Sequence, residues 1–345
     1  MFVHSSVMRI LLLLLVVVAC SAPKKPTFTE QTVGTDAMLQ AISIVDENTV
    51  WLSGHKATFV RTKDGGSTWE VFRHPTGDTL QFRDVHAFDA DNIVMMSAGT
   101  GPQSRIFKVK NGIDWNETFV MPDSLGFLDC IDFWDDKRGV AYGDAIDKFP
   151  YILITEDGGN SWKRVTERGS LPRAGEGEGG FAASGSCVNT GPNGLAWIAT
   201  GAGGTARILR TEDYGKTWRS FYSPIVKGEA AGHTAVDFID ERNGFATGGN
   251  LAVTDAYTAS CIFSEDGGKT WKETLHPVTK GAFYGGSYID GMAFVCGPNG
   301  LDYTTDLGKT WTQLDSANYW AINMHPSGIG WASGKGGRVV KIELR

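Results

Sequence analysis

Two carboxylic acids, Glu178 and Asp129, are the candidates for catalysis in this sequence, because they stand at matching positions of two repeats. A pair of carboxyl groups on opposite sides of a cleft can hydrolyse a glycosidic bond, one acting as the acid and the other as nucleophile or base. Glu178 also lies in the longest irregular insertion, RGSLPRAGEGEGG at 168–180. Long loops on a rigid scaffold often carry function, so a glycosidase is one hypothesis for the activity.

Further polar and aromatic residues begin the same type of strand in several repeats, and we expect them around one end of a central channel. Such a channel end is the default site for a ligand. The candidate binding residues are Arg83, Asp84, Glu176, Glu178, His233, Tyr284 and Tyr319. The segments 143–144 and 248–250 end neighbouring strands and are expected to reach the same face. For Asp84, Asp129 and His233 a structural or solvated role is the open alternative.

The elements that must position these residues are marked by a repeat of eight residues. Its best copies are TKDGGSTW at 62–69, TEDGGNSW at 155–162, TEDYGKTW at 211–218, SEDGGKTW at 264–271 and TTDLGKTW at 304–311. A degenerate copy, KNGIDW at 110–115, fills the widest gap. The final Trp then recurs at intervals of roughly 40 to 56 residues, a length that suits a four-stranded propeller blade.

Each residue type in this repeat has a structural role in a tight turn between two strands. The Asp can accept bonds from backbone N–H groups, the Gly allows a positive φ angle, and the Thr hydroxyl offers a second local bond. The Trp buries a large apolar area between neighbouring sheets. None of these residues is a nucleophile beside a base, so we expect the repeat to build the fold rather than to perform chemistry.

Four types of strand accompany each turn, with period-two alternation bounded by Gly and Asp. The type that precedes each small-residue strand, such as FRDVHAFD at 82–89 or FAASGSCV at 181–188, occurs seven times. The chain ends with two further strands in GWASGKGGRVVKIELR, and PTFTEQT at 26–32 can supply the missing edge. The predicted fold is therefore all-β, a seven-bladed β-propeller closed by pairing of its N- and C-terminal strands.

The turn motif resembles the Asp-box, or BNR repeat, of bacterial sialidases and related propellers. The seven-blade count, with DGGxTW turns across nearly the whole mature chain, is most similar to the photosystem II stability/assembly factor family. This resemblance implies a propeller that binds partners or assists assembly, and it does not imply a photosystem, because fold and function separate readily. The similarity to sialidases is more distant, since this sequence has no RIP motif and sialidases have six blades.

The N-terminus is typical of a secretory signal. MRILLLLLVVVAC, residues 8–20, places Arg9 ahead of an apolar stretch that is shorter than the roughly 20 residues needed to span a bilayer. VVAC followed by Ser21 resembles a bacterial lipobox, which makes Cys20 the expected lipidation site; ordinary cleavage with loss of Cys20 is the alternative. We therefore expect a signal peptide at 1–20, a tether at 21–30 and a single propeller domain at 31–345, anchored at the outer membrane and facing the periplasm.

The four remaining cysteines, Cys130, Cys187, Cys261 and Cys296, lack the paired CxxC spacing of a metal site. Cys130 and Cys187 occupy similar places in successive repeats, so an exported chain could join them, but we favour buried free thiols. The net charge of -7 and the lack of a basic run argue against nucleic acid as a partner. No sequence motif indicates a metal or a cofactor.

The favoured function is a non-catalytic propeller lipoprotein of the cell envelope, monomeric, which binds protein partners or assists assembly. The alternative is a carbohydrate-active hydrolase that acts on a glycan and uses the channel carboxylates. We favour a protein that is not an enzyme, and if it is an enzyme we expect a glycoside hydrolase.

Overall fold

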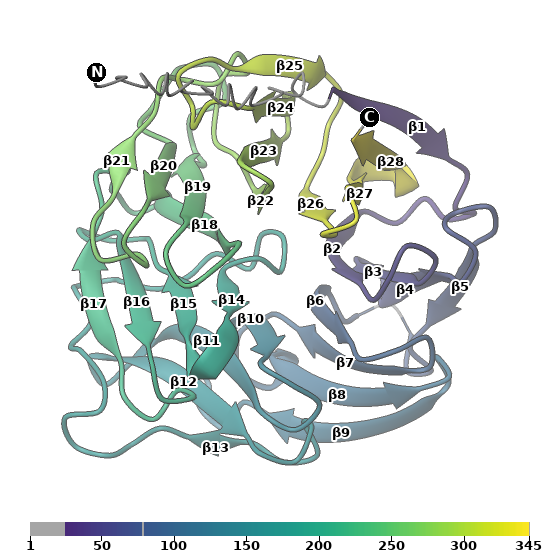
Figure 1. Ribbon diagram of the computed structural model, residues 1–345. Helices are drawn as coiled ribbons and strands as arrows, with labels where there is room; N and C mark the ends of the chain where they lie inside the picture. The colour runs from purple at the N-terminus through teal and green to yellow at the C-terminus, as the bar shows by residue number, and fades with distance from the viewer. Residues whose placement is uncertain (1–24, 78, 345) are drawn as a thin grey trace, which may run out of the picture.

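The computed structural model describes residues 25–77 and 79–344, and within these ranges almost all regular structure is β-strand. Seven four-stranded antiparallel sheets stand around a central channel (Figure 1), so the predicted seven-bladed propeller is confirmed. The expected signal peptide and the expected lipid-bearing Cys20 lie outside the described residues. In the described part of the chain no helix is long and apolar enough to cross a membrane.

Each blade places one strand beside the channel and three strands successively farther out (Figure 1). The innermost strands are β2 (Leu39–Ile44), β6 (Phe82–Ala87), β10 (Leu128–Phe133), β14 (Val188–Thr190), β18 (Ala231–Phe238), β22 (Gly285–Ile289) and β26 (Ala321–Met324). The second strands are β3 (Val50–Gly54), β7 (Asn92–Ser97), β11 (Gly139–Ile146), β15 (Ala196–Ala199), β19 (Gly244–Asn250), β23 (Met292–Gly297) and β27 (Ile329–Ser333).

The outer half of each blade completes the sheet. The third strands are β4 (Thr58–Thr62), β8 (Arg105–Lys110), β12 (Phe149–Thr155), β16 (Arg207–Thr211), β20 (Cys261–Ser264), β24 (Gly300–Thr304) and β28 (Val339–Leu344). The outermost strands are β5 (Glu70–Arg73), β9 (Asp114–Val120), β13 (Lys163–Arg164), β17 (Arg219–Tyr222), β21 (Lys272–Glu273), β25 (Thr312–Asp315) and β1 (Pro26–Gln31). Three short 3-10 turns, Gly101–Gln103, Pro192–Gly194 and Lys335–Gly337, lie in the connections.

The last blade is shared between the two ends of the chain, as predicted. Strand β1 pairs with β28 in an antiparallel register that runs from Pro26 opposite Leu344 to Gln31 opposite Val339. Residues 26–30, the end of the segment that we assigned to the tether, therefore already belong to the blade. The pairing covers the outer edge of β28, and β1 takes the outermost place that β5 and β9 hold in other blades.

The eight-residue repeats form turns that satisfy their own polar groups. In all five good copies one Asp oxygen accepts from the N–H four residues later at 2.8–2.9 Å, and the other accepts from a Thr or Ser hydroxyl at 2.6–2.7 Å. Gly65 and Gly66 of the first copy have φ angles of 66° and 93°. The final Trp218 and Trp271 of later copies are buried. These are the structural roles predicted from the sequence.

Aromatic rings fill the space between blades. Trp197 of β15 stacks on Phe238 of the next blade with ring centroids 3.7 Å apart. Trp69 of the first blade meets Trp331 of the shared blade edge to face at 5.4 Å. Trp197 and Trp331 are completely buried. Because each ring contacts two sheets, the aromatic residues hold neighbouring blades at a fixed separation.

One predicted strand is wrong. We expected FAASGSCV at 181–188 to form an innermost strand, but β14 begins only at Val188. The preceding residues, 179–187, leave the sheet and cross the channel, and we call them the plug. Backbone groups in the middle of the plug bond to side chains of other blades, for example Gly180 N–H to Asp144 at 3.0 Å and Ala182 C=O to Arg83 at 2.9 Å. Its two ends keep backbone bonds, Gly179 with Gly201 and the Cys187 carbonyl with Ala199 N–H. Small residues allow this close approach of the plug to the inner strands.

Candidate binding site at the channel mouth

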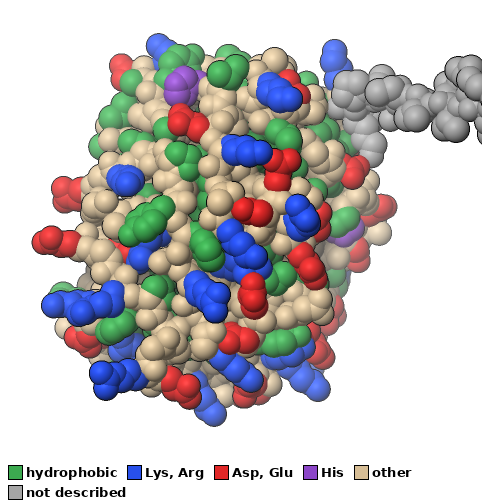
Figure 2. All heavy atoms as spheres, turned by 60° about the vertical axis from the view of Figure 1, so that its left-hand side comes forward, with side chains coloured by type: hydrophobic (Ala, Val, Ile, Leu, Met, Phe, Trp, Pro, Cys, Tyr) green, Lys and Arg blue, Asp and Glu red, His purple; other side chains and the backbone are tan. Residues whose placement is uncertain are grey.

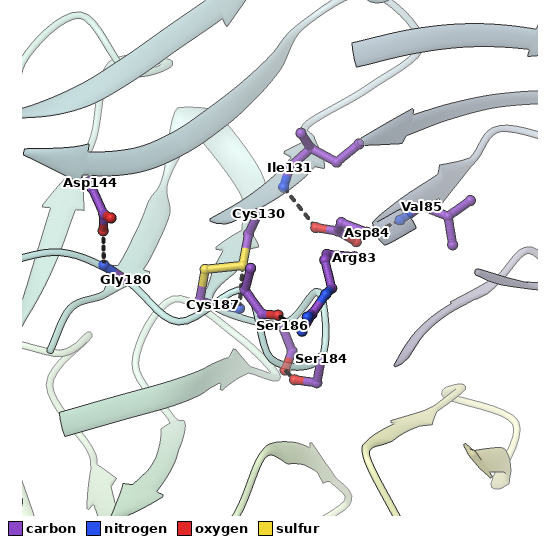
Figure 3. The surroundings of a disulfide bond; sticks show 11 residues. Arg83, Asp84, Val85, Cys130, Ile131, Asp144, Gly180, Ser184, Ser186 and Cys187 are labelled. Atoms are coloured by element: carbon purple, nitrogen blue, oxygen red, sulfur yellow. Dashed lines mark hydrogen bonds between the residues drawn. A yellow bond between two sulfur atoms is a disulfide. The ribbon is translucent and has the colours of Figure 1, made fainter. Parts of the chain in front are cut away.

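A disulfide fixes the end of the plug, which corrects our preference for free thiols. Cys187, the last plug residue, is bonded to Cys130 of β10 (Figure 3), and their Cα atoms are 5.9 Å apart. The sequence indicated that this bridge was possible, because Cys130 and Cys187 occupy similar places in successive repeats. Among the described residues Cys261 and Cys296 are free and buried. Burial raises the pKa of the Cys261 thiol to about 12, so this group is a neutral thiol in the core.

The plug divides the channel into two cavities. The larger one, the mouth chamber, has a volume of about 320 Å³ and lies where the innermost strands begin. Its lining residues are Arg83, Phe127, Asp129, Asp144, Gly180, Phe181, Ala182, Ala183, Leu251, Tyr284 and Trp320. The smaller one, the inner chamber, has a volume of about 120 Å³ and is lined by residues from all seven innermost strands together with Ser184, Gly185 and Ser186.

Two carboxyl groups face the plug in the mouth chamber. Asp129 is only 1% exposed, and its Oδ2 has no hydrogen-bond partner among the described residues. Burial raises the pKa of Asp129 well above its ordinary value and the nearby Asp144 carboxyl raises it further, whereas the Ala182 N–H of the plug acts in the opposite direction. Burial likewise raises the pKa of Asp144, although the Gly180 N–H that bonds to it (Figure 3) acts in the opposite direction.

Glycine is required where the plug meets these carboxyls. A Cβ atom at position 179 would lie 2.0 Å from Asp144 Oδ1, and one at 180 would lie 2.5 Å from Asp129 Oδ2. Both distances are far shorter than a van der Waals contact, so only a residue without a side chain allows the backbone to lie against the acids. The sequence GG at 179–180 is thus explained by this close packing.

The rest of the mouth chamber combines one cation with aromatic walls. Arg83 is held by Ala182 O at 2.9 Å and by Gln81 Oε1 at 2.8 Å, and burial lowers the pKa of its guanidinium. Tyr284 and Trp320 meet edge to face with ring centroids 4.6 Å apart. The chamber therefore offers a large apolar surface beside polar groups of both signs, which suits an amphipathic ligand.

The inner chamber is surrounded by a ring of polar side chains that join each blade to the next, and we call it the latch ring. Its members are Ser43, His86, Asp132, Asn189, Asp237, Ser287 and Asn323, one from each innermost strand. Asp132, for instance, accepts from Thr190 N–H at 2.7 Å in the following blade, and Asp237 accepts from Tyr288 N–H at 2.7 Å. Burial raises the pKa of Asp237 to about 6. These bonds between blades explain why the lining of the inner chamber is polar, without a role in ligand binding.

The predicted site residues separate into distinct places. Arg83, Asp129 and Tyr284 come together in the mouth chamber. Asp84 lies on the other side of the plug, where its two oxygens accept from Val85 and Ile131 N–H at 2.7 Å each (Figure 3). Burial raises the pKa of Asp84 well above its ordinary value. Asp84 therefore joins two blades in the same manner as the latch ring.

Glu178 forms a buried clasp for the long insertion. Both of its oxygens bond to the guanidinium of Arg207, at 2.9 and 2.6 Å, while Thr200 and the Gly175 N–H donate further bonds. The side chains of Glu178 and Arg207 are 3% and 7% exposed. Burial acts to raise the pKa of Glu178, but the bonds from Arg207, Gly175 and Thr200 lower it below its ordinary value. Glu178 lies outside the mouth-chamber lining that contains Asp129, with its hydrogen-bonding capacity already used.

The remaining predicted residues also lie apart from the mouth chamber. His233 is fully buried between Ser223 Oγ and Thr200 O, each 2.8 Å from a ring nitrogen, and burial lowers its pKa to about 4. Tyr319 is fully buried and donates to Asp315 at 2.6 Å. Glu176 is exposed on the insertion. For His233 the geometry matches the structural alternative.

Several residues of the mouth chamber were absent from our candidate list. Phe181 was assigned to a strand, whereas it lies in the plug and lines the chamber. Trp320 directly precedes β26, as Tyr284 precedes β22, so an aligned reading of the repeats could have found it. Asp144 belongs to the 143–144 segment that we expected to reach this face, and it does so.

The outer surface differs from the channel in its charge pattern. The face in Figure 2, which carries the outer strands of the blades on the left of Figure 1, intersperses Lys and Arg with Asp and Glu. Single apolar side chains lie among them. This visible face has no extended region of one sign, whereas the mouth chamber gathers two acids and one Arg in a small volume.

Fold and cavity together define a plugged seven-bladed propeller with a ligand-sized chamber at one mouth. No protein-family model matches the sequence, and no curated protein sequence matches it significantly. The chain is similar in structure to YCF48 from Cyanidioschyzon merolae, with 17% identity, coverage of 92% of this chain and 98% of that chain, and a TM-score of 0.66.

Two further structures have the same fold. YCF48 bound to D1 peptide shares 17% identity over 92% of this chain and 97% of that chain, with a TM-score of 0.63. A streptogramin B lyase shares 13% identity over 93% of this chain and 98% of that chain, with a TM-score of 0.64. The predicted resemblance to the photosystem II assembly factor, YCF48, is confirmed at the level of the fold.

Proposed function

We propose that this protein is a non-catalytic propeller lipoprotein of the bacterial cell envelope that, as a monomer, binds a segment of a protein partner and assists its assembly. The observation that carries the proposal is the mouth chamber, whose aromatic walls and half-buried Asp144 carboxyl suit a side chain supplied from outside. The YCF48 structure with a bound D1 peptide supports it, because that propeller of the same fold holds a peptide.

The location in the envelope is supported by two independent features. The lipobox-like VVAC ending at Cys20 favours a lipid anchor, and the Cys130–Cys187 disulfide favours an oxidising compartment such as the periplasm. Membrane fractionation of the full chain tests the anchor. Cys20→Ser should move the protein from the membrane fraction to the soluble fraction, and an unchanged distribution would contradict the lipid anchor.

Site-specific photo-crosslinking in the native envelope tests the binding role. A photoreactive amino acid in place of Tyr284, at the mouth chamber, should join the protein to a discrete partner. The same group in place of Ile113, which is exposed on an outer turn, is the matched control. Equal adducts at the two positions, or none at the chamber, would count against the proposal.

A hydrolase remains the second candidate, because the mouth chamber does contain two neighbouring carboxyls. The pair is Asp129 with Asp144, whereas the pair that we first considered included Glu178. A raised pKa is typical of a general acid, and the lyase of the same fold shows that this architecture can carry an enzyme. Glycan hydrolysis that disappears in Asp144→Asn would favour this candidate over the binding role.

A further inference from the structure

We propose that the mouth chamber binds a primary ammonium group carried on an apolar stem, and that the ammonium belongs to a lysine side chain of the partner. The identity of the source rests on the function proposed above, whereas the ammonium site rests on the chamber alone. The site combines a buried acidic floor, aromatic walls and a single cation that already has other partners.

The acidic floor lacks a compensating charge. Asp129 is almost completely buried, and its Oδ2 is without a hydrogen-bond partner in the described part of the chain. The neighbouring charge that acts on Asp129 is that of Asp144, another acid. A buried carboxyl that is neither paired nor fully hydrogen-bonded is costly, and a protein retains such a group most readily where a ligand completes it. An ammonium in the chamber has three N–H donors for the half-buried Asp144 carboxyl, and its charge also compensates the nearby Asp129.

Arg83 forms no ion pair with Asp129 or Asp144 in the described part of the chain; its guanidinium bonds to neutral oxygens instead. One nitrogen donates to Ala182 O at 2.9 Å and another to Gln81 Oε1 at 2.8 Å. Its positive charge in the same chamber disfavours a ligand with several cationic centres, such as a polyamine. It also favours a neutral or acidic residue beside the incoming lysine.

The walls suit the stem of a lysine. Tyr284 and Trp320 form one aromatic corner, and Phe181 of the plug and Leu251 add further apolar surface. Lysine buries its four methylenes along such surfaces while its head finds a polar partner. The faces of Tyr and Trp rings attract the same cation. A volume of about 320 Å³ leaves room for one side chain of this size.

Calorimetric titration of the mature, disulfide-bonded protein tests the site. The probe is Nα-acetyl-lysine methylamide, and its Nε-acetylated form has the same stem without the charge. We expect saturable binding of the charged probe and at least about tenfold weaker binding of the acetylated one, because the neutral amide cannot pair with the carboxyls. Absence of binding at millimolar concentration, or equal affinity for both probes, would overturn the proposal.

Matched variants locate the binding. Asp144→Asn should weaken the charged probe about tenfold or more, while Asp147→Asn, which removes an exposed carboxyl from the same hairpin, should leave the affinity unchanged. Equal losses in the two variants would indicate a diffuse surface effect and overturn the site. Asp129→Asn should lose the probe and still raise the melting temperature, since it removes an uncompensated buried charge. Lower stability with undiminished binding would contradict the role of Asp129.

Two arms separate the sources of the ammonium. If n-butylamine binds but a lysine-centred tripeptide does not, the ammonium site stands and the partner lysine is excluded. If both bind, the lysine source is supported even where crosslinking captures no partner. The titration tests the ammonium site and the crosslinking tests the protein partner. A negative result in one experiment therefore leaves the other proposal standing.

Discussion

The outer turns and the channel mouth use the same side chain, aspartate, in opposite ways. In the outer turns both oxygens of each Asp accept bonds from the turn itself, and for Asp64 the Thr68 hydroxyl is the largest cause of a lowered pKa. At the mouth, Asp129 is buried with one oxygen unpartnered, and burial raises its pKa. The difference indicates that the repeated acids stabilise the fold, whereas the mouth acids cost stability and are the better functional candidates.

Glu178 resembles the outer-turn acids because both of its oxygens accept bonds, so we expect it to stabilise the fold. Its replacement should have the largest effect on stability. Glu178→Gln leaves the buried Arg207 without its countercharge and should destabilise the fold by about 3–5 kcal/mol in urea unfolding. Glu176→Gln, on the exposed part of the same insertion, should have almost no effect. Because the folded pKa of Glu178 is lowered, its contribution is present at neutral pH and is lost as the pH falls through that pKa.

The disulfide is a second feature that the plug has and the outer turns lack. Replacing Cys130 and Cys187 together by Ser should lower the stability by about 2–4 kcal/mol, because the bond constrains a long loop of the unfolded chain. Thermal unfolding with and without a reductant measures it. Reductant should lower the melting temperature of the native protein and leave that of the double variant unchanged; a similar response of both would show that the bond contributes little.

A single outer turn should be worth less than either channel feature. Asp213→Ala removes the acceptor for the N–H and hydroxyl of Thr217 and should cost about 1–2 kcal/mol. Lys216→Ala in the same turn is exposed and should change the stability by less than about 0.5 kcal/mol. Similar losses in the two variants would contradict the role assigned to the repeated Asp.

The smallest expected effect is that of Asp129→Asn on the melting temperature, and its pH dependence distinguishes Asp129 from the outer-turn acids. Asp129→Asn should raise the melting temperature by about 1–3 °C at pH 7.5, and this gain should shrink as the pH is lowered. The reason is that the raised pKa makes the folded state take up a proton at Asp129 more readily than the unfolded state, so acidification removes the buried charge. Comparing the variant with the native protein at each pH cancels other groups, including His233. A constant difference would contradict an uncompensated charge at Asp129.

Much of the fold could be predicted because the local turn chemistry repeats and because PTFTEQT supplies the strand that the last blade lacks. The mouth position of Arg83, Asp129 and Tyr284 followed from where the innermost strands begin. The plug could not be foreseen, because FAASGSCV has the length of a strand and nothing local shows that its backbone bonds to other blades. Likewise, Glu178 lies in the long insertion and its partner Arg207 lies on β16, so this ion pair depends on tertiary structure and could not be predicted from the sequence.

The seam between β1 and β28 has a consequence for how the molecule is made. Pro26 pairs with Leu344, so β1, the first strand of the ring, stays unpaired until β28 has been synthesised. Contacts of such long separation in sequence slow folding, and until they form both termini present unpaired strand edges that invite aggregation. A nascent or prematurely terminated chain would therefore remain an open arc in need of protection by chaperones.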